Sequence, residues 1–422
     1  MTDRLPHPPV PDFASPDFDR LLASLTAEFA ATAEHHDRTR EFPAANFARL
    51  HELGLLALTA PVADGGLGAG LDTAYRVVHA VARGEPSTAL ILVMQFLHLA
   101  FHDRLARWPE HLRRRVIGDV VRDGALVNSL RVEPELGTPA RGGLPGTVAR
   151  RVDGGWIING RKLYSTGSPG LTWNFVWARS DDAVPLVGAW LVHRDTPGVR
   201  VIETWDHLGL RASGSHDVVF TDVFVPADHA VDVAPIDQAA APDARFSAWI
   251  GVLLSAVYDG VARAARDWFA EWARTRVPAS LGAPLSSLQR YQQALGEIDG
   301  LLFSNRVLLE SGVRGGLAPA EYSLIKTLVT NQAIAAVQKA VELSSNPGLH
   351  RANPLERHFR DVLCGRIHTP QDDAVYGQLG IAAFAAAAAL AAEGGPLVPK
   401  VAGRAPEGAV IAPPTAVADA AR

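Results

Sequence analysis

The segment RIHTPQDD, residues 366–373, contains side chains that could do chemistry. An imidazole such as that of His368 can act as a general base or as a hydrogen-bond donor near neutral pH, and Thr369 places a hydroxyl beside it. Asp372 and Asp373 follow a proline, where paired aspartates commonly cap a helix. The segment is therefore either an active-site loop or a polar turn between two helices.

The bulk composition limits the classes of function. A chain of 422 residues is too long for one ordinary core and predicts two or three domains. Its net charge of -5 does not support nucleic-acid binding, which requires a basic face. The single Cys364 excludes an internal disulfide framework and suits a reducing cytoplasm. We recognise no secretory signal and no apolar run that approaches the roughly 18 residues of a membrane span, so we expect a cytoplasmic protein without a membrane or metal site.

Hydrophobic patterns divide the chain into an α, β, α order. Residues 16–122 have the apolar spacing of helices. Short alternating runs in 123–235, separated by glycine, proline and aspartate, predict an antiparallel β domain. Long helical patterns return in 240–393, enough for a four-helix bundle. We expect residues 1–15 to be a flexible N-terminus and residues 394–422 to be a low-complexity, unstructured tail.

Four segments resemble conserved segments of the acyl-CoA dehydrogenase superfamily. They are FPAANFARLHELGLLALTAPVADGGLGAG, GGWIINGRKLYSTGS, WDHLGLRASGSHDVVFTDVFVPADH and PLERHFRD, and they follow the family's order. The resemblance implies an α+β multi-domain protein with an N-terminal helical domain, a middle β-barrel-like domain and a C-terminal four-helix bundle. It also implies a flavin between the last two domains, FAD with FMN or reduced FMN as the alternative, and a homotetramer.

The matched motifs assign five residues to the flavin ring. In LYSTG, the family's aromatic and hydroxyl positions fall on Tyr164 and Thr166, which would project together from one face of a strand. In NSLRVEPELGTP, Asn128, Ser129 and Val132 lie nearest the flavin-contacting loop, and Val132 replaces the family's threonine. The structural alternatives are a Tyr–Thr pair on a half-buried strand and an ordinary polar loop.

The resemblance also concerns the diphosphate and adenosine parts of the cofactor. Arg276 matches the family's arginine that reaches the flavin diphosphate, a task that suits a planar guanidinium. A solvated arginine at a helix end is the alternative. The family's glutamine and paired glycines are replaced by Glu342 and by Ser344–Ser345. These replacements leave the choice between FAD and FMN open.

The opening segment departs from the family at its catalytic position. The family's glutamate aligns with Thr369, and no glutamate occurs in residues 366–380. A second family position, on an early bundle helix, aligns with Ile250, and Asp259 is the only carboxylate near it. Desaturation of an acyl thioester requires a base that removes the α-proton. Threonine cannot act as that base near neutral pH.

His368 is the predicted replacement. It could act as the base, or it could hydrogen-bond oxygen on a reduced flavin, as in the superfamily's monooxygenases similar to dibenzothiophene monooxygenase. His98, in MQFLHLAF, could supply a second imidazole or be a core or interface histidine. The predicted catalytic set is therefore His368, Thr369 and His98.

Three functions fit these observations. The first is a flavin-dependent, acyl-CoA dehydrogenase-like oxidoreductase without the usual glutamate, acting on acyl-CoA or a related small molecule with an electron-transfer flavoprotein as partner. The second is a two-component monooxygenase that takes reduced flavin from a separate flavin reductase. The third is a non-catalytic flavin or acyl-CoA binding protein. The sequence predicts an oxidoreductase of the superfamily and does not separate the first two functions.

Overall fold

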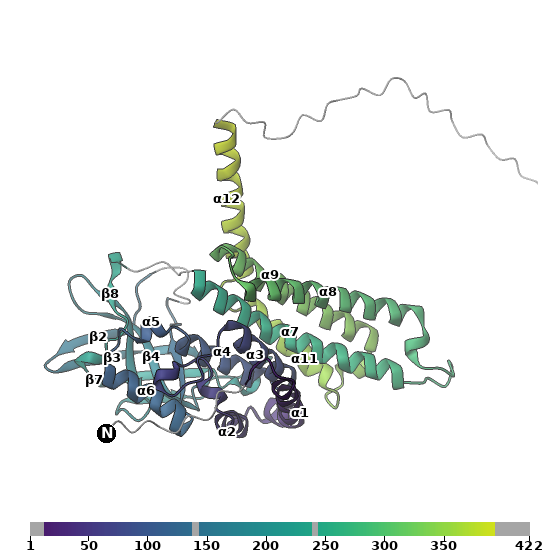
Figure 1. The fold of residues 1–422 in the computed structure, drawn as a ribbon, viewed down its shortest axis with the longest axis horizontal. Helices are drawn as coiled ribbons and strands as arrows, with labels where there is room; N and C mark the ends of the chain where they lie inside the picture. The colour runs from purple at the N-terminus through teal and green to yellow at the C-terminus, as the bar shows by residue number, and fades with distance from the viewer. Residues whose placement is uncertain (1–11, 137–142, 239–243, 393–422) are drawn as a thin grey trace, which may run out of the picture. The chain divides into compact units, whose positions relative to one another are not determined.

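The computed structural model describes residues 12–136, 143–238 and 244–392 (Figure 1). The predicted tail at 394–422 and most of the predicted flexible N-terminus lie outside these residues. Two compact units are distinguished, Met1–Val375 and Tyr376–Arg422. All the sites described below belong to the first unit.

The N-terminal part is helical, as predicted. Local signals start its helices: the hydroxyl of Ser15 accepts the N–H of Phe18, and the carboxylate of Glu85 accepts the N–H groups of Ser87 and Thr88. The helices are α1 (Pro16–Thr39), α2 (Ala44–Glu52), α3 (Leu71–Gly84), α4 (Pro86–Leu99), α5 (His102–Leu105) and α6 (Glu110–Asp123).

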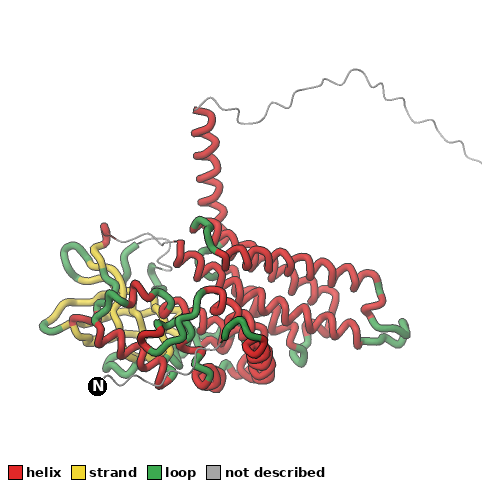
Figure 2. Tube along the Cα trace, viewed as in Figure 1, coloured by secondary structure: helices red, strands yellow, loops and turns green. Residues whose placement is uncertain are grey.

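The middle part contains the strands β1 (Leu126–Leu130), β2 (Val148–Val152), β3 (Gly155–Ser165), β4 (Leu171–Ser180), β5 (Leu186–His193), β6 (Val199–Ile202), β7 (His216–Pro226) and β8 (Ala234–Pro235). They form one sheet in the order β6-β7-β3-β2-β4-β5-β8, with β1 beside β4. Figure 2 shows these strands in yellow, gathered at one end of the first compact unit. The predicted antiparallel pairing is wrong for two pairs of neighbouring strands, because β1 and β2 both run parallel to β4. Alternation predicts a strand but not its direction.

A buried ion pair ties the segment after β1 to β3. Lys162 Nζ lies 2.5 Å from Glu133 Oε1, and both side chains are almost completely buried. The backbone N–H of Thr147 also donates to the Glu133 carboxylate, at 3.0 Å. These bonds satisfy the buried carboxylate, as a buried charge requires.

The C-terminal part contains α7 (Ala244–Thr275), α8 (Gln289–Arg314), α9 (Pro319–Ser344), α10 (Asn346–Leu349), α11 (Pro354–Leu363) and α12 (Asp372–Ala392). Helices α7, α8, α9 and α11 pack together, and α7 also packs against α3 and α4 (Figure 1). This confirms the predicted helical domain. By length and composition, two described helices could cross a membrane: α7, whose apolar window is 83% buried, and α12, whose window is 6% buried.

One loop joins the β domain to the bundle. The N–H of Leu210 donates to Asp361 Oδ1 at 2.7 Å, and Arg360 donates to the carbonyl oxygen of Leu208 at 2.9 Å. Gly209 lies between them, and a Cβ there would lie 2.4 Å from the carbonyl oxygen of Arg360. Only glycine therefore permits this close approach.

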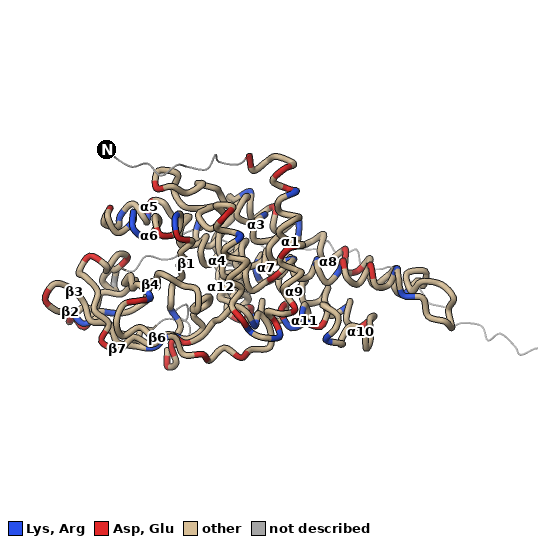
Figure 3. The backbone as a smooth tube through the Cα atoms, turned by 90° about the horizontal axis from the view of Figure 1, so that it is seen from below, with Lys and Arg blue, Asp and Glu red and all other residues tan. Residues whose placement is uncertain are grey.

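Figure 3 shows Lys and Arg interspersed with Asp and Glu along the elements. This distribution agrees with the mild net charge of the chain.

Candidate active site

The segment predicted as an active-site loop follows the short 3-10 helix η8 (Cys364–Arg366). Lys326 of α9 holds it, because its Nζ donates to the carbonyl oxygens of His368 at 2.8 Å and Pro370 at 3.0 Å. The Lys326 side chain is fully buried, and burial lowers its pKa to about 8. The two bonds fix the backbone on both sides of Thr369.

Asn331, also on α9, forms a second contact with the loop. Its Nδ2 donates to Asp372 Oδ2 at 2.7 Å, and its Oδ1 accepts from Arg366 Nε at 2.8 Å. Asp372 and Asp373 lie in the first turn of α12, where negative charge stabilises a helix. Asp372 therefore has a structural role, although its Oδ1 is buried without a hydrogen-bond partner among the described residues.

The imidazole of His368 faces the phenol of Tyr258, which is fully buried on α7. Their ring centroids lie 5.7 Å apart. His368 Nε2 and the Tyr258 hydroxyl are both buried and have no hydrogen-bond partner among the described residues. Burial, aided by the charge of Lys326, lowers the pKa of His368 to about 4, and burial raises the pKa of Tyr258 well above its ordinary value. Both groups are therefore neutral at physiological pH.

Two buried carboxylates of the bundle, Asp259 and Asp361, are engaged elsewhere. Asp259, on α7, is fully buried. It binds His79 at 3.0 Å, Arg263 at 2.7 Å and Asn305 at 3.0 Å. Asp361 accepts the Leu210 N–H, and burial raises its pKa to about 7.

The β domain brings several predicted flavin residues together. Asn128 Nδ2 donates to the carbonyl oxygen of Thr166 at 2.9 Å. The hydroxyl of Ser215 donates to Thr166 Oγ1 at 3.0 Å and lies 2.8 Å from the hydroxyl of Ser213. The predictions missed these serines, although GLRASGSHD contains both. Serines are common in turns, so their type alone does not indicate a site.

Tyr164 and Thr166 do not alternate on a regular strand, so this prediction is wrong. Strand β3 ends at Ser165, its register shifts between Lys162 and Ser165, and Tyr164 has a φ of 52°. This left-handed conformation breaks the two-residue period on which the prediction depends. The Tyr164 ring is 54% exposed and lies edge-on to His207, with centroids 5.8 Å apart.

His98 anchors β1, because its Nε2 accepts the N–H of Ser129 at 3.1 Å. Its ring packs edge-on against Phe175 at 5.0 Å. Burial, followed by the charges of Arg104 and Arg131, lowers the pKa of His98 to about 3. This geometry matches the core or interface alternative for His98.

Val132 pairs with strand β3, since its carbonyl oxygen accepts the N–H of Leu163 at 2.9 Å. Arg276 instead follows the far end of α7 and is exposed. It is 18 residues beyond Tyr258, about 27 Å along a helix. Within one chain, Arg276 is therefore far from Tyr258, which contacts His368.

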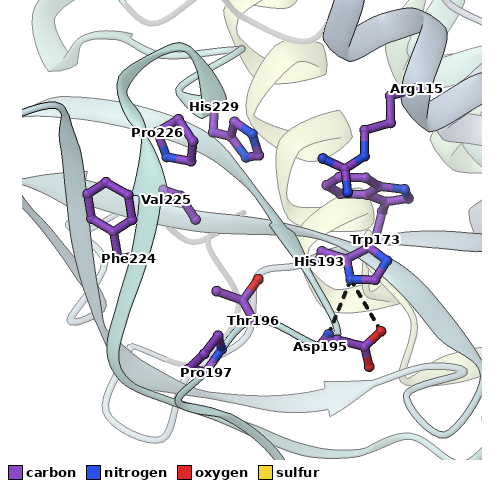
Figure 4. A pocket seen from close by; sticks show the side chains of 10 residues that line it. All are labelled: Arg115, Trp173, His193, Asp195, Thr196, Pro197, Phe224, Val225, Pro226 and His229. Carbon is purple, nitrogen blue, oxygen red and sulfur yellow. Dashed lines mark hydrogen bonds and ion pairs between the residues drawn. The ribbon is translucent and has the colours of Figure 1, made fainter.

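A cavity of about 280 Å³ lies elsewhere on the β domain, where Arg115 lies over the Trp173 ring and His193 contacts Asp195 (Figure 4). It contains none of the predicted site residues. We therefore do not include it in the candidate active site.

Comparison with known proteins identifies the family. Profiles of the N-terminal, middle and C-terminal domains of acyl-CoA dehydrogenases match residues 19–107, 132–223 and 252–372. The putative acyl-CoA dehydrogenase YdbM of Bacillus subtilis is 34% identical over 373 residues, which cover 86% of this chain and 95% of YdbM. The chain belongs to the acyl-CoA dehydrogenase family.

Other relatives carry names other than dehydrogenase. L-evernosamine nitrososynthase of a Micromonospora species is 30% identical, with 83% of this chain and 85% of that protein covered. The structure of KijD3 in complex with dTDP has a TM-score of 0.76 and 29% identity, and covers 88% of this chain and 98% of KijD3. This family member is therefore a flavoprotein oxidoreductase, and its relatives carry the names acyl-CoA dehydrogenase and nitrososynthase. KijD3 has also been solved in complex with FMN.

Ser344 and Ser345 align with the family's paired glycines, and one of them has a backbone conformation typical of glycine. Ser345 has a φ of 55°, in the region that favours glycine. Ser344 is buried and donates to the carbonyl oxygen of Ala340 at 2.6 Å, whereas Glu342 lies 3.4 Å from Lys339. The backbone at Ser345 therefore has a conformation that favours glycine, although the residue is a serine.

Proposed function

We propose that the chain is a flavin-dependent monooxygenase of the acyl-CoA dehydrogenase superfamily that uses reduced FAD or FMN from a separate flavin reductase. The observation that carries this proposal is the absence of a free carboxylate at the loop position of the family's base. Thr369 stands there after a neutral His368, and Asp259 and Asp361 are committed to protein partners. Removal of an α-proton therefore lacks its usual base.

The polar groups of the β domain suit the edge of a flavin ring. Asn128, Thr166 and the serine hydroxyls would hold the edge of the flavin ring, and the exposed ring of Tyr164 would cover it. Ser129 and Val132 would offer backbone groups to that edge. When bound, reduced flavin supplies the two electrons with which one oxygen atom of O₂ enters the substrate and the other leaves as water.

His368 and Tyr258 would act on the oxygen face of this site. A phenol with a raised pKa remains a hydrogen-bond donor, and a neutral imidazole can donate or accept a proton at Nε2. Because both groups are buried, their hydrogen bonds would act in a site of low dielectric, where they are stronger than in water. Lys326 would keep His368 in place through the loop backbone.

The relatives support this proposal in part. Two of them carry the name nitrososynthase, and the FMN-bound TdsC shares the fold at a TM-score of 0.71. The second candidate is an acyl-CoA dehydrogenase in which His368 is the base. The identity of 34% to YdbM favours this candidate, and its electron acceptor would be an electron-transfer flavoprotein. For either reaction we propose a cytoplasmic homotetramer in which Arg276 would reach the flavin of a neighbouring subunit.

Two reactions of the purified protein separate the candidates. One sample is titrated anaerobically with a panel of acyl-CoAs, and another receives chemically reduced FMN or FAD and oxygen. A monooxygenase leaves the acyl-CoAs unchanged and alters the rate at which hydrogen peroxide forms from the reduced flavin. Bleaching of bound FAD by an acyl-CoA, with appearance of the enoyl-CoA product, would refute the proposal. A flavin that is bound tightly but inert in both assays would indicate the non-catalytic binding protein.

The variants His368→Phe and His368→Gln test the role of the imidazole. Loss of a positioned proton donor or acceptor typically lowers a rate by about 10²–10⁴-fold. We expect that loss for His368→Phe and partial retention for His368→Gln, which keeps a polar end. Equal activity of His368→Phe and the wild type would remove His368 from the mechanism.

A further inference from the structure

A second cavity, of about 470 Å³, lies between α1, the loop at Leu208 and the start of α11. It is outside the candidate active site, and none of the predicted catalytic or flavin residues lines it. Its wall contains three carboxylates and five arginines, which are Arg38, Arg211, Arg351, Arg357 and Arg360.

The carboxylates of this cavity are already paired. Asp37 lies 2.6 Å from Arg360, which also binds Glu356 at 2.8 Å. Glu34 lies 2.6 Å from Arg38. Five positive and three negative side chains leave the lining with a formal charge of +2.

Arg211 is also committed to protein groups. Its Nε donates to the carbonyl oxygen of Asp37 at 2.9 Å, and its Nη1 donates to the carbonyl oxygen of His207 at 2.9 Å. The excess charge therefore lies on Arg351 and Arg357.

Arg357 is the unexplained residue in this wall. It is only 8% exposed, and its Nε is buried without a hydrogen-bond partner. Its guanidinium makes no ion pair or hydrogen bond with any residue in the described parts of the chain. Asp361 lies one turn along α11, but burial raises the pKa of that carboxyl to about 7. Buried guanidinium groups are normally paired, since an uncompensated buried charge is costly. This arginine therefore lacks its partner.

We propose that this cavity binds the diphosphate group of a ligand, with Arg357 at the base and Arg351 at the exposed rim. Two uncompensated guanidiniums match the charge of a diphosphate diester, and their planar forks suit its oxygens. The lining contains no aromatic ring on which a nucleotide base could stack. The cavity would therefore recognise the diphosphate and not the base of the ligand. The inference does not depend on the reaction proposed above.

Two sources could supply such a diphosphate: the cofactor, if it is FAD, or a substrate that carries a nucleotide or coenzyme A. The first experiment measures binding of inorganic pyrophosphate to the purified full-length protein by calorimetry, at low and high salt. Competition with pyrophosphate by FAD but not FMN identifies the cofactor. Competition by ADP or coenzyme A with unchanged flavin content identifies the substrate.

Three variants test the residues. We expect Arg351→Gln to weaken pyrophosphate binding at least tenfold and Arg357→Met to abolish it. Arg306→Gln, whose arginine forms an exposed pair with Glu310 on α8, should bind as the wild type does. Without ligand, Arg357→Met should melt at a higher temperature than the wild type, because methionine removes a buried unpaired charge.

Clear results would overturn the proposal. The first is no saturable pyrophosphate binding by the wild type at millimolar concentration. The second is equal affinity for Arg351→Gln and Arg306→Gln. A lower melting temperature for Arg357→Met, with binding unchanged in Arg351→Gln, would assign Arg357 to the protein's own packing.

Discussion

At the scale of single residues, the candidate active site differs from a site for α-proton removal mainly in its charge. A glutamate would place a negative charge beside the flavin, whereas His368 and Tyr258 are neutral. Neutral donors in a dry site stabilise negative charge that develops during a reaction, and they do not repel it. This set of side chains therefore suits oxygen chemistry better than the removal of an α-proton.

Lys326→Met tests how the loop is held. Methionine fills a similar volume but leaves the carbonyl oxygens of His368 and Pro370 without their donor, which costs about 1–3 kcal/mol each if they stay buried. We expect a lower free energy of unfolding in urea and a lower kcat with little change in KM. Lys339→Met is the control on the same helix, because among the described residues Lys339 pairs only with exposed Glu297 and Glu342. Equal losses in the two variants would contradict a positioning role.

Asp361→Asn tests the buried carboxyl through the pH dependence of stability. Burial raises the folded-state pKa to about 7, above the ordinary value of 3.8. The resulting stabilisation is complete below about pH 4 and is lost as the pH rises to about 7. Asparagine keeps an acceptor for Leu210 but cannot ionise. The variant should therefore gain unfolding free energy relative to the wild type, on the order of a few kcal/mol, between pH 4 and 7.

The control for this measurement is Asp299→Asn. Arg266 lowers the pKa of Asp299, so its contribution has the opposite sign and is lost as the pH falls. Denaturant titrations at several pH values would measure both variants. A difference between Asp361→Asn and the wild type that does not change with pH would show that Asp361 is already ionised in the folded protein at pH 4.

At the scale of elements, the approach of the β domain to α11 depends on Gly209. A methyl group there would meet the carbonyl oxygen of Arg360, a backbone atom that cannot turn aside. We expect Gly209→Ala to lower the unfolding free energy by about 1–3 kcal/mol, as overpacking typically does. Gly296→Ala, where no atom lies within 4 Å, should instead stabilise α8 by up to about 1 kcal/mol. Thermal melts of both variants would show the opposite signs.

The arrangement of helices and strands explains which features the sequence could predict. The helical and β segments followed from hydrophobic periodicity. The motifs assigned Thr166 and Asn128 to the flavin ring, and the two residues lie in hydrogen-bond contact, but their binding of a flavin stays a prediction. The predicted direction of the Tyr164 side chain was wrong, because a tyrosine in the sequence does not indicate a left-handed backbone conformation. Lys326 and Tyr258 were missed because their burial depends on how α7 and α9 pack, which a single sequence does not encode locally.

At the scale of the whole molecule, the two candidate reactions make different demands on partners. A monooxygenase needs reduced flavin from another protein, so the chain should be active with any reductase that releases reduced FMN or FAD. We expect activity to depend on the concentration of free reduced flavin and to be independent of electron-transfer flavoprotein. Steady-state assays with two unrelated reductases would measure this. Activity with electron-transfer flavoprotein alone would support the dehydrogenase.

The bond between Leu210 and Asp361 has a consequence for the dynamics of the protein. A single amide of the β domain is protected by a side chain of the helical bundle. Its hydrogen–deuterium exchange should therefore report the separation of the two domains and not local fraying of the loop. If the domains open as one cooperative event, Leu210 and the amides of α11 should exchange with the same free energy of opening. The loop would then be a probe of how often the β domain and the helical bundle separate.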